Sequence, residues 1–315
     1  MSKTLTIRYT SDTHGYLYPT SYADMQDRPM GLMKLASEYP HDGNTLIIDG
    51  GDTIQGSPLT NLYQRLSPEK KAACLTEDTY GTHPIAAMMN LAGYQFVTLG
   101  NHDFNYGVDA LLDYLTNLDA LCLCANIRDK EGRLPIAPDA VHQLENGLRI
   151  GLVGVCTHFV RRWENPKTVE QLVIEEPVPA AKAALEAVKP LCDLTVLIYH
   201  GGFECDLETG KPLTASAENQ ACRMCRELDF DLVLTGHQHM RVDGVHFGNS
   251  FAVQPAYRAP HCCGVTVTVE DDGSKRFESR IIPADGRPLE SACNLLMPLE
   301  KRVQTWLDTP AGHLD

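Results

Sequence analysis

Apolar runs of β-strand composition alternate along this chain with segments of helical periodicity, and this alternation restricts the fold to the α/β class. Runs that are apolar throughout, rather than at every second residue, are typical of strands buried on both faces. We expect strands at 4–10, 45–49, 96–99, 121–125, 149–155, 193–199 and 231–235, and later in SFAVQP, GVTVTVE and KRFESRII. We expect helices at 31–39, 83–94, 108–118, 178–188 and 215–227.

Two polar stretches, 54–82 and 156–177, are interpreted as irregular surface insertions. Near the C-terminus, PADGRPLE has the composition of a linker, and SACNLLMPLEKRVQTWL after it has helical periodicity. A single helix after a linker is typical of a bridge between domains. The predicted organisation is therefore a main domain over 1–285 and a segment over 286–315 that leads towards a C-terminal domain absent from this sequence.

Short polar clusters stand directly after five of the expected strands. They are Asp12-Thr13-His14, Gly50-Gly51-Asp52, Gly100-Asn101-His102-Asp103, His200-Gly201-Gly202 and Gly236-His237-Gln238-His239. Ligands bind at the carboxyl ends of strands in sheets of this kind. Any one cluster is ordinary turn chemistry. Because all of them occupy the same structural position, the sequence predicts that they form one site.

The residue types in these clusters favour metal ions. Residues i and i+2 of an extended chain face the same side, so Asp12 and His14 can hold one ion, and the two histidines of the Gly236–His239 cluster repeat that spacing. Asp52 lies in a glycine turn, where its carboxylate can bridge two ions. We expect neighbouring Asp49 to support that turn. Two ions that share a carboxylate are the arrangement used in metal-assisted phosphoester hydrolysis.

The same clusters supply further donors. The side-chain carbonyl of Asn101 can bind a metal, His102 beside it can act as an acid or a base, and His200 follows a continuous apolar strand. The remaining histidines are interpreted as surface or structural residues, except His261, which is left open. They are His41, His83, His142, His158 and His246.

Composition narrows the class of partner and the compartment. A net charge of −14 argues against broad nucleic-acid binding, but bound divalent cations would still attract small anionic substrates. No apolar run is long enough for a membrane span, and the N-terminus lacks a signal peptide. We therefore expect a cytoplasmic protein, or an extracellular or cell-surface one if the chain is a piece of a longer precursor.

The chain has 11 cysteines, an odd number scattered through apolar segments. Cys222 and Cys225 form a CxxC pair in the expected helix 215–227, but no second pair stands at the spacing of a zinc ribbon. We expect reduced, buried thiols rather than disulfides or a zinc site.

In order and spacing, D-x-H … G-D … G-N-H-D … H … G-H-x-H resembles the signature of calcineurin-like metallophosphoesterases, from residue 4 to about 285. Within that superfamily, GDTIQGSPL at 51–59 and GNHDFNYG at 100–107 resemble the bacterial 2′,3′-cyclic-nucleotide 2′-phosphodiesterase/3′-nucleotidase branch of the 5′-nucleotidase family. The resemblance implies a four-layer α/β/β/α sandwich.

The resemblance also implies a ligand set. The first metal would be held by Asp12, His14, Asp52 and His239, and the second by Asp52, Asn101, His200 and His237. His102 would be the catalytic histidine, and Asp103 is a second catalytic candidate, since Asn105 stands where 5′-nucleotidases have an aspartate. We expect two Mn²⁺ ions, with Zn²⁺, Fe²⁺, Co²⁺ or Ni²⁺ as alternatives.

The implied activity is hydrolysis of 2′,3′-cyclic nucleotides and 3′-nucleotides. A 5′-nucleotidase or nucleotide-sugar hydrolase of the same family is the nearest alternative, and a non-catalytic metal-binding scaffold is a third. Scaffolds usually lack a ligand, and here all seven are present. The absence of an H-x-H-x-D-H motif disfavours a metallo-β-lactamase type of hydrolase. Family members usually clamp the base with aromatic side chains of a C-terminal domain, which this sequence does not include.

Overall fold

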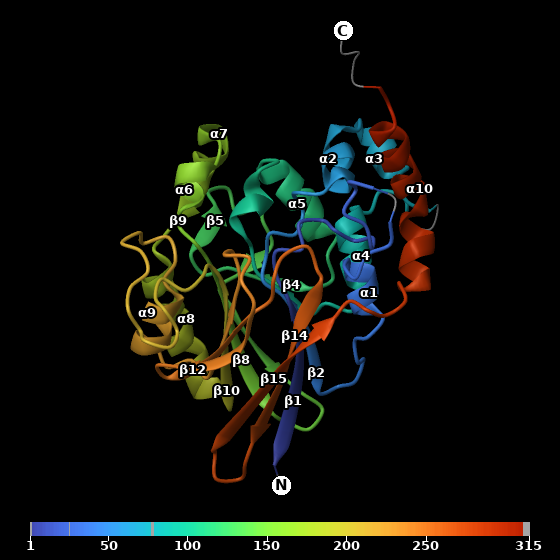
Figure 1. Ribbon diagram of the computed structural model, residues 1–315. Helices are drawn as coiled ribbons and strands as arrows, with labels where there is room; N and C mark the ends of the chain where they lie inside the picture. Colours follow the sequence, from blue (N-terminus) through green and yellow to red (C-terminus); the bar gives the residue numbers. More distant parts are fainter. Residues whose placement is uncertain (1, 25, 77–78, 311–315) are drawn as a thin grey trace.

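Two β-sheets packed face to face form the centre of the computed structural model, which describes residues 2–24, 26–76 and 79–310 (Figure 1). The first sheet has the order β15 (Lys275–Pro283), β14 (His261–Val269), β1 (Lys3–Thr10), β2 (Thr45–Asp49), β3 (Phe96–Val97), β4 (Leu121–Leu123) and β6 (Ile136–Ala137). The second has the order β12 (Val242–Phe247), β13 (Ser250–Gln254), β11 (Leu232–Thr235), β10 (Leu194–His200), β8 (Arg149–Cys156) and β7 (Asp139–Gln143).

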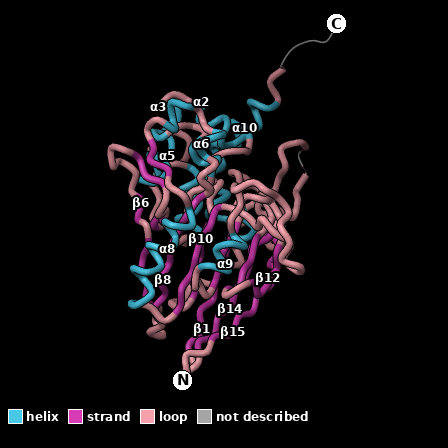
Figure 2. The backbone as a smooth tube through the Cα atoms, turned by 90° about the vertical axis from the view of Figure 1, so that its left-hand side faces the viewer, coloured by secondary structure: helices cyan, strands magenta, loops and turns pink. Residues whose placement is uncertain are grey.

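Most neighbours in both sheets are parallel. In the first sheet β1, β2, β3, β4 and β6 run parallel, and β14 and β15 are added antiparallel. In the second, β8, β10, β11 and β13 run parallel between antiparallel edge strands. Figure 2 shows the long strands side by side, rising from the end of the molecule where the N-terminus lies. The parallel strands of each sheet therefore deliver their carboxyl ends to a common edge.

Apolar side chains fill the space between the sheets. Leu5, Ile7 and Tyr9 of β1 pack there with Val196 and Ile198 of β10, and all are fully buried. Burial of such a side chain contributes about 1.5–3 kcal/mol relative to exposure. This shared core makes the two sheets one rigid support for the loops at their ends.

Helices cover the two outer faces. The first sheet packs against α1 (Leu32–Ala36), α4 (Pro84–Ala92) and α5 (Val108–Thr116), with α10 (Glu290–Leu307) packed on α4, and the second against α8 (Pro177–Val188) and α9 (Ala221–Glu227). The order helix, sheet, sheet, helix confirms the predicted four-layer α/β/β/α sandwich.

The two predicted insertions are more regular than expected. The first contains α2 (Pro58–Arg65) and α3 (Pro68–Ala72). Ser57 caps α2 by accepting a hydrogen bond from the Thr60 amide, and Leu59 and Tyr63 are buried. The second contains α6 (Val160–Trp163), α7 (Pro166–Val169) and β9 (Leu172–Ile174), which pairs with β5 (Ile127–Asp129). The side-chain caps Ser57 and Asn165 and a Pro at the start of α2, α3 and α7 are the signals that polarity alone does not show.

The predicted helix 215–227 begins only at Ala221. The residues before it make hydrogen bonds that a helix would forbid. The Glu218 carbonyl accepts from the Thr157 hydroxyl, and the Asn219 side chain accepts from the Gly202 amide. The first six residues of the prediction are therefore wrong, and they belong to a loop that crosses the carboxyl end of the second sheet.

The prediction that all cysteines are reduced is also wrong. Cys205 and Cys222 form a disulfide, which closes the loop that ends at α9. The loop folds back and brings their Cα atoms to 6.3 Å, within the range a disulfide can bridge. The remaining cysteines are free, and most are buried as expected.

Helix α10 packs against the main domain. Leu295, Leu296, Leu299 and Val303 are buried in the core that also contains residues of α1 and α4. The boundary at 285 stays a prediction, and residues 311–315 of the predicted segment 286–315 lie outside the described residues. Across the described ranges, no helix combines the length and the apolar character needed to cross a membrane.

Candidate metal centre

The polar clusters predicted from the sequence meet at the carboxyl ends of the strands. Asp12 follows β1, Asp52 follows β2, His200 ends β10 and His237 follows β11. Asn101 begins a short 3₁₀ helix after β3. Both sheets therefore contribute, and the site lies where their two edges adjoin.

The donors form two groups. The ligand atoms of Asp12, His14 and His239 all lie within 4.8 Å of one another, and so do those of Asp52, His200 and His237. In the first group, His239 Nε2 lies 3.5 Å from Asp12 Oδ1 and 3.2 Å from His14 Nε2. The aspartates and histidines are divided between the two groups as the predicted ligand sets divide them, except that Asp52 appears in the second group only.

Asp52 lies between the groups. Its Oδ2 is 3.2 Å from His200 Nε2 and 3.9 Å from His14 Nε2, one histidine from each group. Its Oδ1 accepts a hydrogen bond of 2.7 Å from the His102 amide. A carboxylate in this position can reach two ions at once, which is the bridging position expected for it.

Backbone carbonyls orient two of the imidazoles. His14 Nδ1 lies 2.9 Å from the Gln55 carbonyl, and His200 Nδ1 lies 2.7 Å from the Gly50 carbonyl. A carbonyl only accepts, so each Nδ1 carries the proton and each Nε2 is left to face the centre. The two ring nitrogens of His237 have the opposite roles. Its Nε2 lies 2.7 Å from Glu218 Oε1, and its Nδ1 remains to bind an ion.

Apart from the 3.2 Å contact between Asp52 Oδ2 and His200 Nε2, three buried atoms of this centre have no hydrogen-bond partner in the described part of the chain: Asp52 Oδ2, Asn101 Oδ1 and His200 Nε2. Leaving such an atom unsatisfied costs about 1–3 kcal/mol. Each of them is of a kind that binds divalent cations. The donor set therefore fits a pair of metal ions.

The electrostatics agree with that fit. Burial alone lowers the pKa of His200, but Asp52 and Asp12 outweigh it and raise the pKa to about 10. Burial alone raises the pKa of Asp52, but His200 and His14 hold it well below its usual range. A pocket that retains a proton so firmly carries a strongly negative potential, which divalent cations would neutralise.

The backbone of the ligands is strained. Asp12, His14, Asp52, His237 and His239 have φ of 55°, 49°, 56°, 72° and 57°, in the left-handed region. Non-glycine residues in such conformations cost of order 1–3 kcal/mol each and cluster at functional sites. Gly51 between strand and ligand packs against the backbone of Leu99 and Gly100, where any side chain would clash.

Asp103, the second catalytic candidate from the sequence, is bound by backbone amides. Its Oδ2 accepts from the amides of Asp52 and Gly100 at 2.9 and 2.8 Å. Its Oδ1 accepts from the amides of Thr53 and Ile54 at 2.8 and 3.1 Å. Three of these four bonds come from the loop that carries Asp52, so both oxygens of this buried carboxylate hold that loop in place.

Asp49 supports the same loop from its other side. It accepts hydrogen bonds from the Gly51 amide at 3.0 Å and from the hydroxyls of Thr10 and Thr53 at 2.7 and 2.6 Å. The predicted turn-supporting role of Asp49 is confirmed by these contacts.

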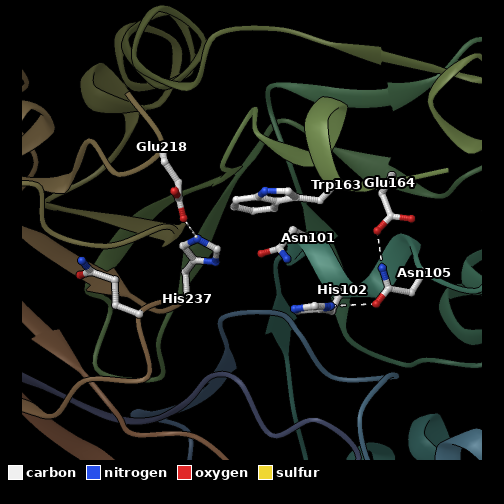
Figure 3. Close-up of a pocket in the computed structure, with 8 residues that line it drawn as sticks. Asn101, His102, Asn105, Trp163, Glu164, Glu218 and His237 are labelled. Carbon is white, nitrogen blue, oxygen red and sulfur yellow. Dashed lines mark hydrogen bonds and ion pairs between the residues drawn. The ribbon is translucent and has the colours of Figure 1, made fainter. Parts of the chain in front are cut away.

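His102 begins a chain of hydrogen bonds (Figure 3). Its Nδ1 lies 2.8 Å from Oδ1 of Asn105, and Nδ2 of Asn105 donates to Glu164. Burial raises the pKa of Glu164, which is 9% exposed. Sequence reasoning missed Glu164 because it comes from the second predicted insertion, far from any motif.

A pocket of about 360 Å³ opens beside His102 and His237, large enough for a small ligand. Figure 3 shows Trp163 projecting between them and Glu218 at the far side of His237. The lining residues are Asn101, His102, Asn105, Trp163, Glu164, Glu218, His237 and Gln238. Trp163, Glu164 and Glu218 carry no motif, and no signal in a single sequence places them here.

The other histidines lie elsewhere. His83 is buried and accepts a hydrogen bond from the Ile85 amide at the start of α4. His246 is exposed on an edge strand. His261, left open by the sequence, accepts from the Ala256 amide at 3.3 Å and belongs to neither donor group of the described residues.

Comparison with known proteins agrees with this geometry. The chain is 27% identical over 250 residues to the trifunctional nucleotide phosphoesterase protein YfkN of Bacillus subtilis, covering 75% of this chain and 16% of YfkN. It is 25% identical over 316 residues to the 2′,3′-cyclic-nucleotide 2′-phosphodiesterase/3′-nucleotidase of Salmonella typhimurium, covering 91% of this chain and 46% of that protein. The chain spans less than half the length of these two relatives.

A solved structure has the same fold. A Staphylococcus aureus protein described as a 5′-nucleotidase, solved with alpha-ketoglutarate, superposes with a TM-score of 0.83 at 28% identity over 97% of this chain and 59% of that one. The sequence profile of the calcineurin-like phosphoesterase family matches residues 5–241, a range that includes every predicted metal ligand. The chain therefore belongs to the calcineurin-like phosphoesterase family.

Proposed function

We propose that this chain is a metal-dependent phosphoric ester hydrolase whose substrates are 2′,3′-cyclic nucleotides and 3′-nucleotides. The observation that carries the proposal is the pair of donor groups with Asp52 between them, together with the unsatisfied buried atoms of Asp52, Asn101 and His200. This arrangement suits two divalent cations, and its position beside an open pocket suits a small phosphoester.

One ion would be held by Asp12, His14, Asp52 and His239, and the other by Asp52, Asn101, His200 and His237. We propose Mn²⁺, with Zn²⁺, Fe²⁺, Co²⁺ and Ni²⁺ as alternatives, because a mixed nitrogen and oxygen donor set admits all of them. When bound, such ions lower the pKa of water and neutralise charge on phosphoryl oxygens.

His102 would act on the leaving group. Its Nδ1 is held by Asn105, so Nε2 is the nitrogen free to act in the pocket. In its protonated form it can hand the Nε2 proton to the ribose oxygen as the ester bond breaks, which avoids an alkoxide leaving group. The His102 ring also lies edge-on to His14, 5.4 Å between centroids, so it adjoins the metal donors.

The choice among nucleotide esters rests on the His102 neighbourhood. Asn105 stands beside His102, as in the cyclic-phosphodiesterase branch, and the Salmonella typhimurium relative carries that name. The Staphylococcus aureus neighbour, described as a 5′-nucleotidase, supports the 5′-nucleotidase alternative, and a nucleotide-sugar hydrolase of the same family stays a further alternative. A metal-binding scaffold without activity is a weaker alternative, since the sequence contains all seven proposed ligands.

A substrate panel tests the proposal. Chelator-treated protein would be assayed with and without Mn²⁺ on 2′,3′-cAMP, 3′-AMP, 5′-AMP, a nucleotide sugar and bis-p-nitrophenyl phosphate. For the cyclic substrate both AMP and phosphate are quantified, because ring opening alone releases no phosphate. Mn²⁺-dependent turnover of 2′,3′-cAMP and 3′-AMP above 5′-AMP is expected. Preference for 5′-AMP or the nucleotide sugar would move the chain to the alternative activity.

Two variants control the panel. Asp52→Asn removes the carboxylate between the donor groups, and we expect bound metal to fall and turnover to drop at least about 100-fold. His246→Ala removes an exposed histidine remote from the centre and should retain both. Two ions per chain by elemental analysis with no turnover of any ester would favour the scaffold.

A further inference from the structure

Trp163 is an exposed aromatic residue inside the candidate site. Trp163 is the last residue of α6, and it is 45% exposed. Its side chain lines the pocket beside His102. Its ring stacks on His237 at 5.4 Å between centroids and 25° between planes, and Phe159 supports it edge-on at 5.7 Å. A large apolar ring held in place but left open to solvent within a pocket is typical of a ligand contact.

The position of Trp163 relative to His102 indicates which part of a substrate it would meet. The proposed proton donor for the leaving oxygen is His102, so the leaving nucleoside must extend from the metal centre on the His102 side. On that side the pocket is lined by Asn105, Trp163 and Glu164 (Figure 3). A nucleoside leaving group therefore passes within reach of the Trp163 ring.

We propose that Trp163 is a platform on which the nucleobase of the substrate stacks. The inference rests on the proposed function, since it assigns the base subsite of the same pocket. Indole and base present flat π faces, and stacking of this kind tolerates different bases. The subsite lies within the α/β/β/α domain itself, because Trp163 belongs to a helix of the second predicted insertion.

The polar lining indicates the base to use as a probe. Glu164 and Glu218 present carboxylates, which accept hydrogen bonds when ionised. Adenine offers an exocyclic amino group that donates to such acceptors. Adenosine is therefore the probe of choice, and it has no phosphoester, so its binding is independent of hydrolysis.

Tryptophan fluorescence isolates the platform. The chain has two tryptophans, Trp163 and Trp306. Trp306 lies on α10, where its ring contacts the Arg65 guanidinium, 5.5 Å from the ring centroid. Trp306→Phe leaves Trp163 as the sole reporter, and Trp163→Phe leaves Trp306. Titration of the metal-loaded variants with adenosine should quench the fluorescence of Trp306→Phe saturably. The fluorescence of Trp163→Phe should stay unchanged. The absence of quenching in Trp306→Phe would overturn the proposal.

Kinetics provide the second test. Glycerol 1,2-cyclic phosphate has the same cyclic ester as 2′,3′-cAMP and no base. Trp163→Ala should lower kcat/KM for 2′,3′-cAMP, relative to kcat/KM for this control substrate, by about 5- to 150-fold. A loss equal for both substrates would mean that Trp163 only supports His237, and the platform would be rejected.

Tyr257→Ala is the matched control. Tyr257 stacks on His239 at 4.4 Å and 8°, as Trp163 stacks on His237, but it does not line the pocket. Its loss should affect the hydrolysis of both cyclic esters alike.

Failure of the proposed function is separable from failure of the platform. If no nucleotide is hydrolysed but adenosine still quenches Trp163, the platform stands. If nucleotides are hydrolysed and adenosine does not quench Trp163, the platform falls.

Discussion

His102 donates from Nδ1 to Oδ1 of Asn105 over 2.8 Å, and this bond determines which ring nitrogen is available to a substrate. The orientation of the Asn105 amide is in turn fixed, because its Nδ2 must donate to the Glu164 carboxylate. An amide therefore stands between the histidine and the buried acid. The carboxylate acts on His102 through Asn105 and not by direct contact.

Asn105→Ala should lower kcat about 10- to 100-fold with little change in bound metal, because His102 would rotate freely while the ion ligands stay in place. Glu164→Ala should behave in the same direction, whereas Glu164→Gln keeps an acceptor for the Asn105 amide and should stay closer to the wild type. Steady-state kinetics at saturating Mn²⁺ with elemental analysis would check this. If Glu164→Gln is as impaired as Glu164→Ala, the charge and not the hydrogen bond is what matters.

Asp103 is predicted to position Asp52 and not to act in catalysis. Asp103→Asn would turn an amino group towards backbone amides that now donate to a carboxylate, leaving donors unsatisfied at a cost of about 2–5 kcal/mol of unfolding free energy. Metal affinity should fall about 10- to 100-fold, and kcat should recover when metal is saturating.

Denaturant unfolding and metal titration would measure both effects of Asp103→Asn. The opposite result is equally clear. A variant that binds two ions with unchanged affinity, yet loses kcat as His102→Ala does, would favour a catalytic role for Asp103 instead.

Acid should destabilise the fold through His83. Burial, with a smaller contribution from Lys71, lowers the pKa of His83 to about 3. The folded pKa lies below the unfolded value of about 6.5, so the unfolded chain binds the proton more tightly. This contribution is complete above the unfolded pKa and declines as the pH falls from about 6.5 towards 3. Between pH 7 and pH 5 it amounts to about 2 kcal/mol.

His83→Asn keeps a side chain that can cap α4 and removes the titration. The unfolding free energy of the wild type minus that of this variant, measured at several pH values, should therefore fall by about 2 kcal/mol from pH 7 to pH 5. Because the difference is taken at each pH, titration of the metal centre cancels. A difference independent of pH would contradict the assignment.

The disulfide should stabilise the fold. Cys205 and Cys222 are separated by 17 residues, and closing a loop of that length contributes about 3 kcal/mol. A dithiol reductant should lower the Tm of the wild type, and the double variant Cys205→Ser/Cys222→Ser should start from the lowered value and not respond. Cys192→Ser removes a free, half-buried thiol and should respond like the wild type. A wild type insensitive to reductant would refute the prediction.

The architecture and the metal donors were predictable because their signals are local. Continuous apolar runs identify buried strands, and the donors of Asp12, Asn101 and His237 directly follow such runs. Strand ends in parallel sheets share an edge, so placing the strands also placed the donors.

The remainder of the pocket depends on contacts between distant segments. Glu164 reaches Asn105 across 59 positions of the sequence, and Glu218 reaches His237 from a loop that resembled a helix. Asp103 is a catalytic candidate because Asn105 stands where 5′-nucleotidases have an aspartate, and no local signal shows that its carboxylate turns towards the amides at 52–54. The disulfide was missed for the same reason, since Cys205 gives no local sign of its partner.

The left-handed backbone of Asp12, His14, Asp52, His237 and His239 has a consequence for protein engineering. Glycine adopts such conformations without strain, so a screen for heat resistance alone should favour glycine at these five positions. Each gain in thermal tolerance would delete a donor. A library selected only for survival at high temperature would thus converge on well-folded proteins that can no longer bind metal, and these positions should be held fixed before any stabilisation begins.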